Sequence, residues 1–239
     1  MHKRKNKDGL YEVVKRYFEP SAGQIPVLLV DTGTLIDFEE RAKEEKSREA
    51  PHRIAGKLFN DIGSLASYVV FPRGIYDEIV EHHCKSKKNG KSEIGEETCN
   101  LVRDYSANSE KILEATRFDY HYSEPYKNEV DKLQELVEHL HREVNGDIRG
   151  GKKIDRDPIS QNDLELLNTA IRFAVKSLFE FRLRQEESGD VASDIEGTYR
   201  IAVVSPDSHI YRPLNALITR AEGVSYRDYL QAFNPREYN

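Results

Sequence analysis

Three short, predominantly apolar runs constrain the fold of this chain more than any other feature. They cover residues 25–30, 68–71 and 199–204, and they lack the alternation of polar and apolar side chains that marks a half-exposed strand. Such runs are typical of strands buried on both faces of a parallel sheet. Helical patterns lie between them, and strands that alternate with helices form right-handed crossovers. The sequence therefore predicts an α/β fold with a central, mainly parallel sheet.

The helical patterns divide the remainder of the chain. Apolar spacing predicts helices over residues 8–19, 53–66, 98–146, 160–184 and 210–221. A last short strand is predicted near Val224. These elements suggest an N-terminal helix and lead-in over residues 1–24 and one domain over 25–230. Within that domain we expect a helical insertion at about 98–158, and after it a C-terminal tail over 231–239.

Composition and charge narrow the class of protein. The 239 residues carry a net charge of −6, which is unlike a general nucleic-acid coating protein but compatible with a nuclease that has clustered acids. No apolar run approaches the roughly 20 residues that cross a bilayer, and the basic N-terminus lacks the apolar stretch of a signal peptide. Two cysteines, Cys84 and Cys99, indicate no disulfide framework. We therefore expect a cytoplasmic protein without a membrane partner.

Four acids fall where the predicted fold would bring them together. Asp31 directly follows the first apolar run, and Asp207 follows the last one by three residues. Ligands of open α/β sheets bind beyond the carboxyl ends of the strands. Glu78 lies one to two turns into the helix after the second run, and Asp163 opens the helix over 160–184 on its buried face. The sequence thus predicts one cluster at one edge of the sheet.

The chemistry of such a cluster points to a divalent cation. Mg²⁺ and Mn²⁺ are hard ions that prefer carboxylate oxygens and retain several waters. One or two of them activate a water, polarise a phosphoryl group and stabilise the leaving oxygen. We expect Asp31, Asp163 and Asp207 to bind the metal directly or through water, and Glu78 to complete the site or orient the attacking water. Thr32 and Ser205 are expected to hold these carboxylates by hydrogen bonds.

Each acid also has an ordinary structural interpretation. Asp31 could cap the helix that follows it, and Asp207 could belong to a simple turn. Asp163 stands third after Ser160, as in a capping box, and Glu78 could be a solvated helix residue. These roles would place four unrelated acids on one edge of a parallel sheet by chance. We therefore favour a shared functional site.

The order of these motifs resembles the PIN-domain family. An apolar strand ends in Asp-Thr, a second strand leads to a helix with Glu, a helix begins with Asp before small apolar residues, and a last strand ends in Ser-x-Asp. Here these motifs are Val-Leu-Leu-Val-Asp-Thr at 27–32, residues 69–78, residues 160–170 and Val-Val-Ser-Pro-Asp at 203–207. The resemblance spans about residues 25–230. It implies a three-layer α/β/α fold, a metal-dependent endoribonuclease and catalytic roles for Asp31, Glu78, Asp163 and Asp207.

The resemblance also implies partners and has limits. Many PIN domains are toxins of toxin–antitoxin pairs, so RNA is the expected substrate and an antitoxin or other protein a candidate partner; a homodimer is also compatible with the sequence. The chain is longer than compact members between Glu78 and Asp163. It has Ser208 and His209 where the family often places another acid after Asp207.

Other functions are compatible with parts of the sequence. A catalytically silent PIN-like module would bind RNA or protein through the insertion, and a related nuclease would act on DNA flaps. His82, His83, Cys84 and Cys99 match no common zinc motif. Two lysine- and arginine-rich stretches are either solvated loops or phosphate contacts: Lys85, Lys87, Lys88 and Lys91, then Arg149, Lys152, Lys153 and Arg156.

Overall fold

A four-stranded parallel sheet organises the protein. The computed structural model describes residues 9–19, 23–45, 47, 49–85, 93–145, 147–149, 152–154, 159–188, 198–220 and 224–238. The sheet has the order β2-β1-β5-β6, and every neighbouring pair is parallel. Its strands are β1 (Ile25–Val30), β2 (Tyr68–Val70), β5 (Tyr199–Val204) and β6 (Leu230–Phe233).

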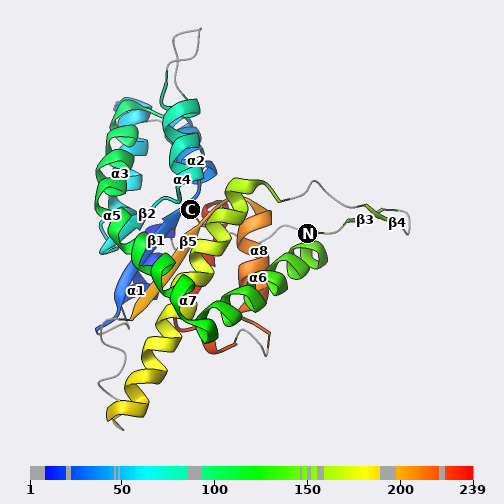
Figure 1. Ribbon diagram of the computed structural model, residues 1–239. Coiled ribbons are helices and arrows are strands. Elements are labelled where there is room, and N and C mark those ends of the chain that lie inside the picture. Colours follow the sequence, from blue (N-terminus) through cyan, green and yellow to red (C-terminus); the bar gives the residue numbers. More distant parts are fainter. Residues whose placement is uncertain are drawn as a thin grey trace.

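Helices flank this sheet. They are α1 (Leu10–Phe18), α2 (Thr32–Glu44), α3 (Pro51–Gly63), α4 (Arg73–Glu78), α5 (Glu96–Tyr122), α6 (Glu124–Asn145), α7 (Gln161–Ser188) and α8 (Ser208–Leu217). Figure 1 shows α3 beside α5 near β2, and α6 beside α8, which packs on β6. Helix α7 packs on β5. The predicted α/β class with a parallel central sheet is confirmed, and the arrangement is consistent with three layers.

The central strands are apolar because they are covered on both faces. Strands β1 and β5 are buried from their third residue to their last, and the side chains of Leu28, Leu29, Ala202 and Val203 are fully inaccessible. Burying each leucine-sized side chain contributes about 1.5–3 kcal/mol. Since β1 and β5 are the two inner strands, the residues that follow them also lie at the centre of the sheet edge.

The region predicted as an insertion packs into the same core. Helix α5 contacts β2 and α3, and α6 contacts α7 and α8. Buried side chains from α5 and α6, such as Val102, Val130, Leu133 and Leu140, belong to the hydrophobic cluster that includes the central strands. Between α6 and α7, β3 (Asp147–Arg149) and β4 (Lys152–Ile154) form a separate antiparallel pair. None of the described helices is long and apolar enough to cross a membrane.

The last strand lies later than the sequence predicts. Val224–Tyr226 (η2) is a 3₁₀ turn, and β6 begins at Leu230, so it extends into the segment expected to be a tail. A short 3₁₀ helix, η3 (Pro235–Glu237), then follows. Arg41 of α2 donates to the backbone carbonyl of Tyr238 at 3.2 Å and also to that of Pro235. This segment is therefore fixed beside the last turn of α2.

Cys84 and Cys99 form a disulfide, which the sequence does not predict. The chain leaves α4 through η1 (Ile79–His83), a π-helical turn, and Cys84 follows it directly. The segment before α5 returns to the same place, because the Gly95 amide donates to the buried carboxylate of Glu39 at 2.7 Å. This return depends on tertiary contacts, so counting cysteines could not reveal it.

Candidate carboxylate cleft

Asp31 is held at the centre of the sheet edge. Val30 and Val204 are paired across β1 and β5, so Asp31 and Ser205 leave the sheet side by side. The Asp31 amide extends the ladder by donating to the Val204 carbonyl at 3.1 Å. The Ser205 hydroxyl donates to Asp31 Oδ2 at 2.9 Å, and only 6% of Asp31 is exposed. Asp31 stands at the N-cap position of α2, but its side chain makes no capping hydrogen bond.

Asp207 lies next to the same serine. Its amide donates to Ser205 Oγ at 3.0 Å. Its Oδ1 accepts the His209 amide at 2.7 Å, so it caps α8. The Ser205 hydroxyl therefore connects the two strand-end acids, as a donor to Asp31 and an acceptor from Asp207. The side chain of Asp207 therefore caps a helix, whereas that of Asp31 does not.

Glu78 is positioned by the first turn of α7. The side-chain amide of Asn162 donates through Nδ2 to Glu78 Oε2 at 2.6 Å. Glu165 Oε2 accepts the Gly74 amide at 2.9 Å and so satisfies the start of α4. A Cβ atom at position 74 would stand 2.4 Å from Asn162 Oδ1, so a larger residue there would displace the Asn162 side chain. The two helices are locked together with Glu78 at their junction.

Asp163 opens α7 beside Ser160. The Asp163 amide donates to Ser160 Oγ at 3.1 Å, and hydrogen bonds from Ser160 to the Asp163 carboxyl complete the pattern. This is the reciprocal arrangement of a capping box, with Asp in the place of the usual Glu. Asp163 is half-buried, so it serves the helix and also faces the neighbouring acids.

All four predicted site residues line one cleft of about 600 Å³. We call it the carboxylate cleft. Arg236, with its Nε 3.0 Å from Asp37 Oδ1, and His83 supply basic side chains to its wall. The full lining is Asp31, Thr32, Gly33, Ile36, Glu78, His83, Ser160, Asp163, Pro206, Asp207, Ser208 and Arg236.

The acids of the cleft oppose one another's ionisation. Burial raises the pKa of Asp31 to about 7; the Ser205 hydrogen bond acts against this rise, and the charges of Asp163, Asp207 and Glu78 add to it. Burial also raises the pKa of Asp163, with Ser160 opposing and Asp207 adding to the effect. A cation in the cleft would remove this conflict, because it favours the charged form of each carboxylate.

The donor set suits a cation that keeps much of its water. In the described part of the chain, no group of three or more His, Cys, Asp or Glu side chains is arranged to hold one metal ion. Mg²⁺ commonly takes only one or two carboxylates and completes its shell with water and substrate phosphate. Asp31 and Asp207, joined through Ser205, offer such a pair. The buried Thr32 hydroxyl also lines the cleft and has no hydrogen-bond partner among the described residues.

The predicted site residues did not include His83 and Arg236, which line the cleft, or Asn162, which holds Glu78. Asn162 directly precedes Asp163, and this adjacency was its only signal in the sequence. His83 follows Glu78 by five positions, which a regular helix would separate by about 140° around its axis. The π-helical turn brings His83 Nε2 to 3.8 Å from Glu78 Oε1. Arg236 comes from the predicted tail, for which the sequence carried no signal.

Other predicted features stay apart from this cleft or outside the described residues. Cys84 and Cys99 are oxidised to a disulfide, so they provide no thiolate for the zinc site considered above. Lys87, Lys88, Lys91 and Arg156 lie outside the described residues. Lys85 forms an exposed ion pair with Glu81.

Comparisons with known proteins name no relative of this chain. No protein-family model matches the sequence, and searches of curated proteins and of solved structures find no similar protein.

Proposed function

We propose that this protein is a divalent-cation-dependent nuclease of the PIN-like type that hydrolyses RNA phosphodiester bonds. The observation that carries the proposal is Asp31: a buried carboxylate at the end of a central strand, without a capping role, facing three other acids in one cleft. Burying an acid beside like charges is unfavourable unless a cation accompanies it. RNA as the substrate rests on the resemblance of the four motifs to PIN domains.

The residues of the cleft have three roles: they bind the cation, orient the attacking water and contact the phosphate. Asp31 and Asp207 hold the cation, with Ser205 fixing the direction of the Asp31 carboxylate. Asp163 faces them from α7 and binds directly or through water. Glu78, oriented by Asn162, completes the site or accepts a hydrogen bond from the attacking water. Arg236 and His83 on the wall are suited to contact the phosphate.

The cation supplies the chemistry that carboxylates lack. When bound, Mg²⁺ or Mn²⁺ polarises the phosphoryl group and stabilises the developing charge. The residues of the chain orient the water in line with the leaving 3′ oxygen. Hydrolysis would then leave a 5′-phosphate and a 3′-hydroxyl.

Cleavage of RNA by the purified chain tests the proposal. We expect cleavage with Mn²⁺ or Mg²⁺, its loss with EDTA, and a decrease of at least about 100-fold in Asp31→Asn, which removes a ligand charge at constant shape. Asp77→Asn, on the same helix as Glu78 but exposed, is the matched control. Equal rates for wild type and Asp31→Asn would assign the cleavage to another site or to a contaminant.

A second function is a silent module that binds RNA or a protein. Two observations favour it: Asp163 belongs to the capping box of α7 and Asp207 caps α8, and no three acids of the described residues are arranged around one ion. In that case the chain would bind single-stranded RNA with or without EDTA, and no variant of the four acids would change the amount of cleaved product.

A further inference from the structure

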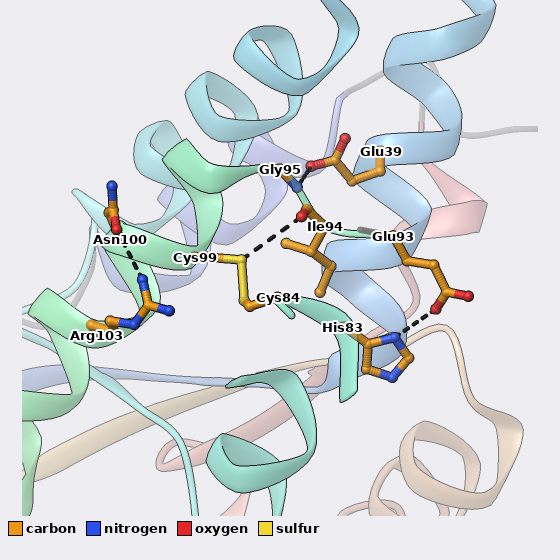
Figure 2. Close-up of a disulfide and its surroundings, with 9 residues drawn as sticks. All are labelled: Glu39, His83, Cys84, Glu93, Ile94, Gly95, Cys99, Asn100 and Arg103. Carbon is orange, nitrogen blue, oxygen red and sulfur yellow. Dashed lines mark hydrogen bonds and ion pairs between the residues drawn. A yellow bond between two sulfur atoms is a disulfide. The ribbon is translucent and has the colours of Figure 1, made fainter. Parts of the chain in front are cut away.

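The disulfide begins at the residue that follows His83, a lining residue of the carboxylate cleft. Cys84, at the end of η1, is bonded to Cys99 in α5, with 5.9 Å between their Cα atoms. Figure 2 shows His83 directly before Cys84. His83 lines the cleft, and its Nε2 is 3.8 Å from Glu78 Oε1. The covalent bond therefore fixes the backbone of a residue that faces the candidate site.

Non-covalent contacts hold the other end of the same loop against His83. Glu93 Oε2 lies 2.6 Å from His83 Nδ1, and the Ile94 amide donates to the His83 carbonyl at 3.4 Å. The next amide, of Gly95, donates to the buried Glu39. Figure 2 shows Glu93 reaching the ring of His83 on one side of the disulfide. The orientation of His83 thus depends on a loop whose two ends the disulfide joins.

The two cysteine residues differ in exposure. Cys99 is buried, with 2% of its surface exposed, whereas Cys84 is half-buried. An external thiolate therefore reaches Cys84 Sγ first and expels Cys99. As a thiol, Cys99 would find an acceptor in place, since its sulfur lies 3.8 Å from the Ile94 carbonyl oxygen. The reduced pair can be accommodated without leaving a buried polar group unpaired.

We propose that Cys84–Cys99 is a thiol–disulfide exchange site through which a dithiol reductant controls the carboxylate cleft. A thiolate of the dithiol attacks Cys84 Sγ, forms a mixed disulfide and releases Cys99, which takes up a proton. The second thiol of the reductant then displaces Cys84. The protein disulfide gains two electrons and two protons, and the dithiol becomes a disulfide. Disulfides in reducing compartments are usually transient or redox-sensing, which suits the predicted cytoplasmic location.

Reduction loosens one wall of the cleft. Once the covalent bond is open, the contacts that remain include those of Glu93 and Ile94 with His83 and the hydrogen bond from Gly95 to Glu39. His83 is then less fixed beside Glu78. Residues that orient metal-binding side chains typically change metal affinity by about 10–100-fold. The oxidised state is therefore the one with the tighter cation site, and this part of the proposal rests on the proposed function.

Oxidised and reduced full-length protein provide the test. Thiol titration with Ellman's reagent should give no thiols before and two thiols after treatment with dithiothreitol, followed by its removal. Mn²⁺ titration should then show about tenfold weaker binding to the reduced protein. The double variant Cys84→Ser/Cys99→Ser should bind like the reduced protein under both conditions. His83→Ala should remove the difference in affinity while still yielding two thiols on reduction. Equal Mn²⁺ affinity of the two wild-type states would overturn the control of the cleft.

Amide hydrogen exchange separates this proposal from the proposed function. Faster exchange at Ile94 and Gly95 after reduction supports an exchange site that frees the loop, whatever the protein binds. If neither state binds Mn²⁺, the proposed function fails and the exchange data decide alone. Unchanged exchange, or two free thiols that never form a disulfide with an oxidised dithiol, would overturn the site itself.

Discussion

The carboxyl of Asp31 links the cleft to the stability of the fold. Its pKa of about 7 in the folded chain, against about 3.9 in an unfolded one, means that folding takes up a proton between these values. The contribution of Asp31 to the free energy of unfolding of the metal-free protein therefore falls as the pH rises from about 4 to about 7, by about 4 kcal/mol. We expect urea unfolding in EDTA to show lower stability at pH 8 than at pH 5.

Asp31→Asn isolates this effect, because it keeps the shape but cannot ionise. The variant should be more stable than wild type at pH 8 in EDTA and should lose most of the decline between pH 5 and pH 8. Asp77→Asn, with an exposed side chain, should show the same decrease in the free energy of unfolding with pH as the wild type. A slope that persists in Asp31→Asn would place the responsible proton on another group.

Asn162 gives a second prediction at the scale of single residues. Asn162→Ala removes the amide that holds Glu78 Oε2, so we expect about tenfold weaker Mn²⁺ binding with little change in fold. Asn162→Asp places another carboxylate against Glu78, and the repulsion should lower the free energy of unfolding of the metal-free protein. Asn100→Ala, at an exposed position in α5, is the control. Isothermal titration measures the Mn²⁺ affinity of the variants, and urea unfolding in EDTA measures the stability of Asn162→Asp. Wild-type affinity in Asn162→Ala would contradict a positioning role.

At this scale the sequence revealed the acids but not what surrounds them. Asp31 and Asp207 could be placed because each follows an apolar strand, and the geometry of parallel strands brings such residues to one edge. His83 and Arg236 could not, since a π-helical turn and a distant C-terminal segment bring them to the cleft. Their positions depend on tertiary packing, which has no local pattern.

The link between η1 and α5 is the element on which local rigidity depends. The disulfide joins residues 15 apart in sequence, and closing a loop of that length stabilises a protein by about 3 kcal/mol. For a chain of this size that corresponds to about 6–12 °C in melting temperature. We expect dithiothreitol to lower the melting temperature of wild type by this amount.

Cys84→Ser/Cys99→Ser is the control for this prediction. Its melting temperature should match that of the reduced wild type and should ignore dithiothreitol. Differential scanning calorimetry measures both. A wild-type melting temperature that does not respond to a reductant, with two thiols confirmed, would show that the non-covalent contacts alone hold the loop.

Elements with strong periodicity were predicted well, and the short ones near the C-terminus were not. The helices over 98–146 and 160–184 correspond to α5, α6 and α7, whose apolar stripes reach the core. The strand expected near Val224 is instead a 3₁₀ turn, and β6 lies at Leu230–Phe233. The difference arises because β6 is defined by its parallel pairing with β5, and pairing partners are not encoded in a short local run.

The response of the whole molecule to a cation distinguishes a nuclease from a silent module. A ligand that binds only the native state stabilises it by about 2.7 kcal/mol at a hundredfold excess over Kd. This corresponds to a rise of about 5–11 °C in melting temperature. Mn²⁺ should therefore raise the melting temperature of wild type, and Asp31→Asn should blunt the rise. A flat response at millimolar Mn²⁺ and neutral pH would favour the binding module.

The hydrogen bond between Ser205 and Asp31 limits when the site can form during synthesis of the chain. It spans 174 positions, and the two strands that create it are adjacent in the sheet but far apart in the order of synthesis. Contacts of such long range form late, since the loop between them must first close. On the ribosome, Asp31 emerges long before its partner strand exists. The cleft can therefore assemble only after β5 has been synthesised, and fragments that end before β5 should carry Asp31, Glu78 and Asp163 without the site.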